Sequence, residues 1–486
     1  MLDSNDIHPM NNPHQTRPGD KTVNKSRVGV VPSLSFLVED GSIKGKSGTS
    51  PLSIVSLVFI FLIAAGTLFL MLPVSHYGEG VSDPLTALFT ATSAVTVTGL
   101  VVVDTADYWT IFGQGVILFL MFIGGLGFMS IAAFLLAVLG QRVSMKQRLL
   151  IRETLSTERL GGLQRLSVAI VLTAVMIQIL GFVLLLPNFY FEFDIKSAIW
   201  QSLFHSVSGF NNAGFVILPE YGGLAHHQDD WYTLSILTAL IFIGSLSFWV
   251  VSDVVLKRRF NRFSLVSKIV ITMTISLTLA GSILLFLLEG TNPNTMADLP
   301  IVNKIIVSTF ESVSGRTAGF STLNYSDTRI ATNLVIMALM FVGGATASVA
   351  GGIKVSTLFV VVLSIFAIVK EKSHVSAFGR EIDDSTIRRS YAILIVCLAF
   401  SFICSIILAL TNPQISMEVL TFEAVSAFGT VGLSAGATTD LNQVGKLIII
   451  FTMFAGRIGP LLIGLKMVPS QDISEFRYPS ENVTIG

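Results

Sequence analysis

The chain has 486 residues, of which 52% are hydrophobic and only 13% are charged, and its formal net charge is zero. Soluble domains carry about 25% charged residues, so this composition excludes an ordinary soluble protein and indicates a protein with many membrane spans. The neutral balance gives no argument for binding nucleic acid. The two cysteines, Cys397 and Cys404, share one apolar run, which favours buried packing over a disulfide or a metal site.

The first 50 residues are polar and rich in Pro, Asn, Ser and Lys, which predicts a flexible tail without a signal peptide. A helix needs ~20 apolar residues to cross a membrane. Eight runs reach or approach this length and predict eight transmembrane helices. They are Leu52–Leu72, Ile111–Gly140, Ser167–Leu186, Tyr232–Leu256, Leu265–Leu288, Ala331–Val369, Tyr391–Leu410 and Leu447–Leu465.

The sixth run, Ala331–Val369, is too long for one ordinary helix, because it would extend ~58 Å against a hydrocarbon core of ~30 Å. Its four central glycines cost roughly 4 kcal/mol of helix propensity relative to alanine. We predict two helices joined by a non-helical segment that lines a translocation path. The alternatives are a small-residue packing face and, less favoured, a phosphate-binding loop. The segment comprises Gly343, Gly344, Ala345, Thr346, Ala347, Ser348, Val349, Ala350, Gly351 and Gly352, followed by Lys354.

Basic residues alternate sharply between successive loops. They gather in residues 142–165, 257–268 and 370–389 and in the N-terminal tail, whereas residues 73–110 and 411–443 contain neither Lys nor Arg. By the positive-inside rule, the basic loops and both termini are cytoplasmic, which agrees with an even number of spans.

The poorly charged outer loops contain a recurring pattern, in which Phe is followed four positions later by Ser and then by Gly before a large apolar residue. Such short apolar stretches suit re-entrant segments. The four copies run from Phe89 to Leu100, from Phe204 to Phe215, from Phe310 to Phe320 and from Phe422 to Leu433. Their order and regular spacing make chance recurrence untenable, so we predict one repeated unit of helix, short re-entrant helix, glycine strand and helix.

This unit has a specific physical use. Irregular backbone at membrane depth is tolerated only where it is buried in protein or lines a water-filled path. Glycine permits the positive φ that turns successive carbonyls to one side, and rings of carbonyls can replace the hydration shell of a cation. Each short helix also aims its negative C-terminal end at that path. The sequence therefore predicts a pore for a monovalent cation, most simply K⁺, at the centre of four repeats.

The predicted fold class is an all-α polytopic membrane protein with eight transmembrane helices and four re-entrant pore helices in pseudo-fourfold arrangement. The expected divisions are a cytoplasmic tail (1–50), repeat 1 (51–165), repeat 2 (166–263), repeat 3 with the broken helix (264–387), repeat 4 (388–467) and a cytoplasmic C-terminal tail (468–486).

At this point the sequence resembles a known family. Thr430-Val431-Gly432 resembles the start of the Thr-Val-Gly-Tyr-Gly filter of K⁺ channels, and four degenerate filters in one chain are typical of the Trk/Ktr/HKT superfamily of K⁺ transporters. The resemblance covers about Pro51 to Lys466 and is closest to the bacterial Ktr membrane subunit. It implies that the residues before each glycine supply ion-coordinating carbonyls. Carried over by position, these filter residues are Val97, Thr98, Gly99, Asn212, Ala213, Gly214, Thr317, Ala318, Gly319, Thr430, Val431 and Gly432.

The resemblance implies further properties. The glycine-rich interruption of the sixth span corresponds to an intramembrane gating loop in the family. A protein of this kind is a homodimer in the bacterial plasma membrane, on a cytosolic ring of nucleotide-binding, KtrA-like regulatory subunits. K⁺ would be the transported ion and Na⁺ an activating or coupling ion, as in a channel or a symporter. A Na⁺ or non-selective cation transporter is the alternative.

Three charged or titratable residues near the predicted pore need separate interpretation. Arg457 lies inside the last span, where a charge costs ~3 kcal/mol, so we expect it to face the pore, contact the glycine-rich interruption and raise an electrostatic barrier; snorkelling to the interface is the alternative. Arg316 should turn away from the cation path and pair with Glu311 or Glu423, in preference to touching the ion. His205 is interpreted as packing and not as a proton relay.

Two other function classes are less favoured. A secondary carrier with inverted repeats would require halves of opposite topology, whereas every repeat here begins on the cytoplasmic side. An intramembrane enzyme would require clustered catalytic or metal-binding side chains, and the sequence has no His-Glu-x-x-His motif or pair of intramembrane carboxylates. We therefore expect a transporter and not an enzyme.

Overall fold

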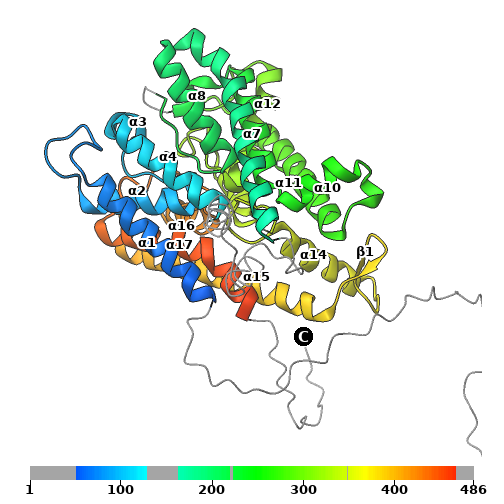
Figure 1. The fold of residues 1–486 in the computed structure, drawn as a ribbon. Helices are drawn as coiled ribbons and strands as arrows, with labels where there is room; N and C mark the ends of the chain where they lie inside the picture. Colours follow the sequence, from blue (N-terminus) through cyan, green and yellow to red (C-terminus); the bar gives the residue numbers. More distant parts are fainter. Residues whose placement is uncertain (1–50, 128–162, 219–222, 347, 467–486) are drawn as a thin grey trace, which may run out of the picture. The chain divides into compact units, whose positions relative to one another are not determined.

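The structure, a computed structural model, describes residues 51–127, 163–218, 223–346 and 348–466 (Figure 1). Nearly all of these residues that form regular structure are helical. The exception is a small antiparallel hairpin of β1 (Ser376–Ala377) and β2 (Arg380–Glu381), in which Ala377 pairs with Arg380. Both predicted tails, the second half of the predicted run Ile111–Gly140 and most of the basic loop 142–165 lie outside the described residues.

The helices follow one another in four groups, and in each group one short helix of 13 to 17 residues precedes the recurring glycine. The first group is α1 (Pro51–Leu70), α2 (Pro84–Thr96), α3 (Thr105–Tyr108) and α4 (Ile111–Leu126). The second is α7 (Leu163–Glu192), α8 (Ile195–Phe210), η1 (Gly223–His227), α9 (Trp231–Ser245) and α10 (Phe248–Lys257), followed by η2 (Phe260–Arg262). The third is α11 (Leu265–Glu289), α12 (Ile301–Thr317), α13 (Ile330–Phe341) and α14 (Val355–Val369), and the fourth is α15 (Asp384–Thr411), α16 (Met417–Gly429) and α17 (Gln443–Lys466).

The short helices α2, α8, α12 and α16 begin at local signals and end directly before the recurring glycine. Asp83 caps α2 by accepting from Thr86 N at 2.9 Å, and Asp194 caps α8 by accepting from Lys196 N at 3.1 Å. The hydrogen bond from Ser197 lowers the pKa of the Asp194 carboxyl. α12 instead begins after Pro300 without a side-chain cap.

Each short helix packs against helices that precede and follow it in its own group. α2 contacts α1 and α4, α8 contacts α7 and α9, α12 contacts α11 and α13, and α16 contacts α15 and α17 (Figure 1). The phenylalanine that opens each sequence repeat is completely buried in this packing: Phe89, Phe204, Phe310 and Phe422. The short helices are therefore held inside the protein, where they position the chain that follows them.

Two long helices are interrupted. The predicted break in the run Ala331–Val369 is confirmed, since α13 ends at Phe341 and α14 begins at Val355. The prediction of one continuous helix over Tyr232–Leu256 was wrong, because α9 and α10 meet at a bend of 101°. Ser247 is extended and its hydroxyl accepts from Val250 N at 3.4 Å, so a local cap begins a new helix there and competes with continuation of the first.

By length and composition, three described helices qualify individually as membrane spans: α7 from Ser167 onward, α11 and α15. The α9–α10 pair would be a fourth if counted as one bent span. The apolar parts of α1, α4, α13 and α14 are shorter. Short and broken apolar helices are expected where neighbouring protein, and not lipid, surrounds part of the chain.

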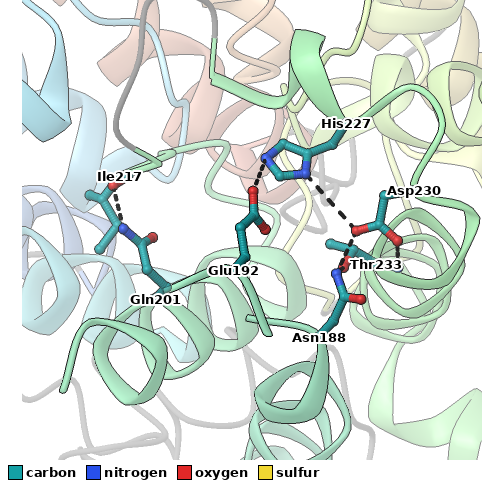
Figure 2. A network of polar contacts seen from close by, with 7 residues as sticks. All are labelled: Asn188, Glu192, Gln201, Ile217, His227, Asp230 and Thr233. Carbon is teal, nitrogen blue, oxygen red and sulfur yellow. Dashed lines mark hydrogen bonds and ion pairs between the residues drawn. The ribbon is translucent and has the colours of Figure 1, made fainter. Parts of the chain in front are cut away.

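A polar network ties together the ends of α7 and α9 in the second group (Figure 2). The Asn188 amide donates to Asp230 Oδ2 at 2.7 Å and to Thr233 Oγ1 at 3.0 Å. His227, on η1, lies 3.7 Å from Glu192 and 4.0 Å from Asp230. These contacts join the C-terminal end of α7 to the N-terminal end of α9, the helix pair that packs on α8.

Candidate functional site

The four recurring glycines meet in a closed ring. A Cβ added at Gly99 would collide with Ala213 O, one at Gly214 with Ala318 O, one at Gly319 with Val431 O, and one at Gly432 with Thr98 O. In each case the separation would be below 3.0 Å, which real Cβ atoms essentially never show. Each glycine therefore lies against the carbonyl that precedes the next glycine, in the cyclic order first, second, third, fourth. We call residues 97–99, 212–214, 317–319 and 430–432 the ring segments.

Several residues of the ring segments have a left-handed backbone conformation. Glycine adopts this conformation readily, but other residues rarely do. All four glycines have positive φ, between +71° and +101°. Val97 (φ 58°), Asn212 (φ 55°) and Thr430 (φ 49°) also have positive φ, two residues before the glycine. For β-branched Val97 and Thr430 this conformation is strained by about 1–3 kcal/mol, and such strain concentrates at functional sites. The third ring segment has only Gly319 in this region, since it is one residue shorter between Ser314 and Gly319.

The serine of each repeat anchors its ring segment in one of two ways. In the first and fourth repeats the hydroxyl accepts from the glycine N–H, Ser93 from Gly99 at 3.0 Å and Ser426 from Gly432 at 3.2 Å. In the second and third, the hydroxyl donates to the carbonyl after the glycine, Ser208 to Phe215 O and Ser314 to Phe320 O. The ring is thus fourfold in outline, but its serine hydrogen bonds divide the repeats into two adjacent pairs, the first with the fourth and the second with the third.

Buried polar side chains on the short helices hold the chain beyond each of the last three glycines. The Glu311 carboxylate accepts from Thr322 N at 2.6 Å and from Tyr325 Oη at 2.7 Å. Glu423 accepts from Ala435 N at 3.2 Å and from the Thr438 hydroxyl at 2.6 Å. In the second repeat, the Gln201 amide donates to Ile217 O at 2.7 Å (Figure 2).

We predict that Glu311→Gln weakens K⁺-dependent uptake and thermal stability. The carboxylate oxygens of Glu311 accept hydrogen bonds, whereas the NH₂ group of the new glutamine can only donate. One of the groups that now donate to Glu311 would therefore lose its acceptor, and a buried donor without a partner costs about 1–3 kcal/mol. The measurement is the ion concentration for half-maximal uptake together with the melting temperature of purified protein. Asp298→Asn is the matched control, because Asp298 is exposed near the start of α12. Equal behaviour of both variants would contradict a positioning role for Glu311.

The break in the sixth predicted span forms a compact loop, here called the glycine-rich segment (residues 343–354). Its ends pair with each other, since Gly343 N donates to Ile353 O at 2.8 Å and Val355 N donates to Gly344 O at 3.2 Å. The Lys354 ammonium folds back and donates to Ala350 O at 2.6 Å. Ala347 lies outside the described residues.

The glycine-rich segment contacts a ring segment and helices of the second and fourth repeats, and Arg457 links it to the first repeat. Gly351 packs against the Thr430 side chain so closely that a Cβ would overlap it. Arg457 donates through Nη1 to Val349 O and through Nη2 to Gly124 O, the latter at 2.8 Å. Ala345 N donates to Ser245 O at 3.0 Å. The segment is therefore held directly beside the ring by backbone and guanidinium hydrogen bonds.

The predicted partners of Arg316 were wrong. Its guanidinium lies 3.4 Å from Thr274 O and 3.5 Å from Gly343 O, while the described hydrogen bonds of Glu311 and Glu423 go to the chain beyond the glycines. The acceptors are a carbonyl within α11 and the carbonyl of Gly343 just beyond α13, and no sequence pattern indicated this arrangement. His205 is completely buried, with Nδ1 2.8 Å from Gln201 O, and it packs on Phe189 and Phe204.

Sequence reasoning missed a second repeated motif, Phe-x-Gly, which lies in helices α4, α9 and α17 and, in the third repeat, at the end of α13. Its glycines are Gly124, Gly244, Gly343 and Gly456. A Cβ at Gly124, Gly244 or Gly456 would collide with the backbone carbonyl near the end of the short helix of the same repeat, at Val95, Phe210 or Phe428. At Gly343 it would collide with Gly351 O. The repeat comparison that found the ring glycines could also have found these, and it places Arg457 where the other repeats have Gly125, Ser245 and Gly344.

A cavity of about 520 Å³ lies against the glycine-rich segment, which contributes Val349, Ala350 and Gly352 to its wall. No ring-segment residue lines this cavity. Its described lining includes Lys354, Arg389 and Arg457 but no Asp or Glu. The segment therefore touches Thr430 of the fourth ring segment and also forms part of the wall of a cavity lined by basic residues.

A helical protein with apolar spans, a ring of four glycine segments and a broken helix beside that ring belongs structurally to the membrane transport proteins. The chain matches the model of the TrkH family, described as cation transport protein, over residues 33–476, and it belongs to that family. Membership in a transport family agrees with the prediction of a transporter and not an enzyme.

Known relatives and a solved structure support the same assignment. The chain is 37% identical to the Ktr system potassium uptake protein B of Bacillus subtilis, over 93% of this chain and 100% of the relative. It is 36% identical to the potassium/sodium uptake protein NtpJ of Enterococcus hirae, over 90% and 97%. The crystal structure of the potassium transporter TrkH from Vibrio parahaemolyticus has a TM-score of 0.65 at 18% identity, covering 88% of this chain and 86% of that one, and so shares the fold.

Proposed function

We propose that this chain is the ion-translocating membrane subunit of a K⁺ uptake system, with the four ring segments as its selectivity filter. The observation that carries this proposal is the closed ring of glycines, each seated against a neighbouring carbonyl. A ring of backbone carbonyls can replace the hydration shell of a monovalent cation without a fixed negative charge. The names of the relatives, which are potassium uptake proteins, support K⁺ as the ion.

The coordinating groups in this proposal are the carbonyls of the ring segments. The short helices end immediately before them, so their C-terminal partial negative charges add to the attraction for a cation. The strained backbone at Val97, Asn212 and Thr430 supports the proposal, because this conformation redirects successive carbonyls. The third segment lacks that feature and is expected to contribute fewer ligands.

The glycine-rich segment is proposed to be the gate. It lies against both Thr430 and the cavity, and its described residues, 343–346 and 348–354, form no regular helix. Arg457 and Lys354 place two positive charges there, which oppose passage of a cation in a region of low dielectric constant. Opening would require Arg457 to release Val349 O, and the segment to withdraw from Thr430.

We further propose that uptake is Na⁺-dependent and that the chain works as a homodimer with a cytosolic ring of nucleotide-binding regulatory subunits. The name of the Enterococcus hirae relative, a potassium/sodium uptake protein, supports a role for Na⁺. The names of the Bacillus subtilis and Vibrio alginolyticus relatives place them in a Ktr system, which supports a protein with further components. The predicted setting is a bacterial plasma membrane with both termini cytoplasmic.

Competition between ions tests the proposed selectivity. In liposomes containing the purified protein, unlabelled K⁺ should compete with uptake of radioactive Rb⁺, because both ions fit a carbonyl ring, whereas Na⁺ should stimulate uptake without competing. The measurement is Rb⁺ uptake over a range of K⁺ concentrations, with and without Na⁺. Equal competition by Na⁺ and K⁺ would favour the alternative function, a non-selective monovalent cation transporter.

A further inference from the structure

α10 and the turn after it join a basic surface to the glycine-rich segment, and Phe248 and Val251 of α10 also line the cavity beside that segment. We propose that residues 248–262 form a binding site for anionic phospholipid head groups, and that bound lipid holds the glycine-rich segment in its present position. The second part concerns the gate and therefore rests on the proposed function.

The geometry places α10 along the membrane surface. α9 has 15 residues and would extend ~22 Å, less than the ~30 Å hydrocarbon core. The chain then turns by 101° into α10, so if α9 crosses the membrane, α10 runs roughly parallel to its plane. An amphipathic helix in this position buries its apolar face about 5–10 Å into the head-group boundary.

The residues of α10 suit that position. Val254, Val255 and Leu256 are 43%, 59% and 77% exposed, which a water-facing helix end would not favour. Four basic residues follow directly, all exposed: Lys257, Arg258, Arg259 and Arg262. The neighbouring acid, Asp253, accepts from Lys257 Nζ at 2.6 Å and from Ser264 N at 3.0 Å, so it is used inside the turn and leaves the arginines as the dominant charge.

The same helix is connected to the glycine-rich segment at its other end. Val250 is completely buried in a cluster with Val342, Ala345 and Val355, which flank or belong to the segment. Ser245, at the end of α9, accepts the Ala345 N–H through its carbonyl oxygen at 3.0 Å. A lipid that fixes α10 in the membrane plane would therefore preserve the bend on which the segment rests.

A lipid fits these observations better than a soluble ligand does. Free phosphate would bind the arginines but would not contact the exposed Val254, Val255 and Leu256. A phospholipid would bind the arginines through its head group and contact the apolar side chains through its acyl chains. A cytosolic protein partner would bind the basic turn but would have no access to apolar side chains at the membrane boundary. The pairing of charge with adjacent apolar surface selects anionic lipid.

Native mass spectrometry of the full-length protein, titrated with the anionic lipid POPG, tests the site. Each basic residue near an anionic membrane surface adds to the affinity for anionic lipid. The variant Arg258→Gln/Arg259→Gln/Arg262→Gln should therefore lose the tightest-bound POPG, and its apparent affinity for POPG should fall by on the order of 100-fold. The matched control is Lys370→Gln/Lys372→Gln/Arg380→Gln, which removes three exposed charges from the loop between α14 and α15. Equal POPG binding by both variants would overturn the site and would leave a protein contact as the role of the arginines.

Disulfide formation measures the coupling between lipid binding and the position of the glycine-rich segment, and it does not depend on transport. In a chain with Cys397→Ala and Cys404→Ala, the pair Leu246→Cys and Ala345→Cys should cross-link several-fold faster in POPC bilayers that contain POPG than in POPC alone. The same change of lipid should slow Rb⁺ uptake by the wild-type chain. Cross-linking that is insensitive to POPG would overturn the coupling. Absence of Rb⁺ uptake in every bilayer, with lipid-sensitive cross-linking retained, would instead contradict the proposed function alone.

Discussion

Replacing Gly432 with alanine is expected to abolish selective K⁺ uptake. The added Cβ would overlap Thr98 O, the carbonyl through which the first ring segment meets the fourth. Gly432 also has a φ of +101°, where any side chain is strained by about 1–3 kcal/mol. Because each ring glycine supports the next carbonyl, displacement at one contact should open the whole ring. The measurement is Rb⁺ uptake and its competition by K⁺ in liposomes, with an expected loss of at least about tenfold.

Gly436→Ala is an unusually close control for this experiment. Gly436 lies four residues later in the same repeat and has a φ of +92°, but nothing lies within 4 Å of the position that an added Cβ would take. It therefore reproduces the backbone strain without the collision. Gly99→Ala, which would meet Ala213 O, provides a second ring position. Comparable uptake by the Gly432 and Gly436 variants would contradict the idea that contact between ring segments sets transport.

Replacing Arg457 with glutamine is expected to raise the rate of transport. The guanidinium donates to Val349 O in the glycine-rich segment and to Gly124 O in α4, so it fastens the segment to the first repeat. Hydrogen bonds from a charged donor contribute about 1.5–3 kcal/mol each, and every ~1.4 kcal/mol corresponds to a factor of ten. Loss of one such bond should increase maximal uptake by about tenfold. The measurement is the maximal Rb⁺ uptake rate per reconstituted protein.

Two further variants distinguish the effect of the positive charge of Arg457 from the effect of its hydrogen bonds to the glycine-rich segment and α4. Arg457→Lys keeps the positive charge but cannot reach both carbonyls with one planar group, so it should raise the rate less than the glutamine variant does. Lys446→Gln removes a charge elsewhere on α17 and should leave the rate unchanged. An unchanged rate for Arg457→Gln would remove the arginine from the proposed gate.

Local sequence patterns predicted the positions of the ring glycines and of the break in the sixth apolar run. The ring glycines were found because Phe, Ser and Gly recur in four outer loops, and the backbone at those positions does require glycine. The break in the run Ala331–Val369 was found because glycine and small polar residues oppose helix formation there. The unusual third ring segment was also visible, as one missing residue between Ser314 and Gly319.

Other features had no local signal or a weak one. The run Tyr232–Leu256 is mainly apolar as far as Asp253, and Gly244, Ser245 and the capping hydroxyl of Ser247 are the local features where it turns by 101°. Arg316 was assigned a carboxylate partner because opposite charges attract, but each nearby carboxylate was already satisfied by hydroxyl and amide donors. The Phe-x-Gly motif could have been read from the sequence, but its purpose depends on how closely two backbones approach.

The sequence by itself determined that this is a polytopic membrane protein with four repeated glycine loops and one broken span, because hydropathy, helix propensity and recurrence are properties of short stretches of chain. Only the tertiary structure decided how the loops meet: the cyclic seating of Gly99, Gly214, Gly319 and Gly432 against one another's carbonyls. It alone also decided that Arg457 joins the first repeat to the third. Such contacts connect residues that are far apart in the chain, and their strength depends on distances that no local pattern encodes.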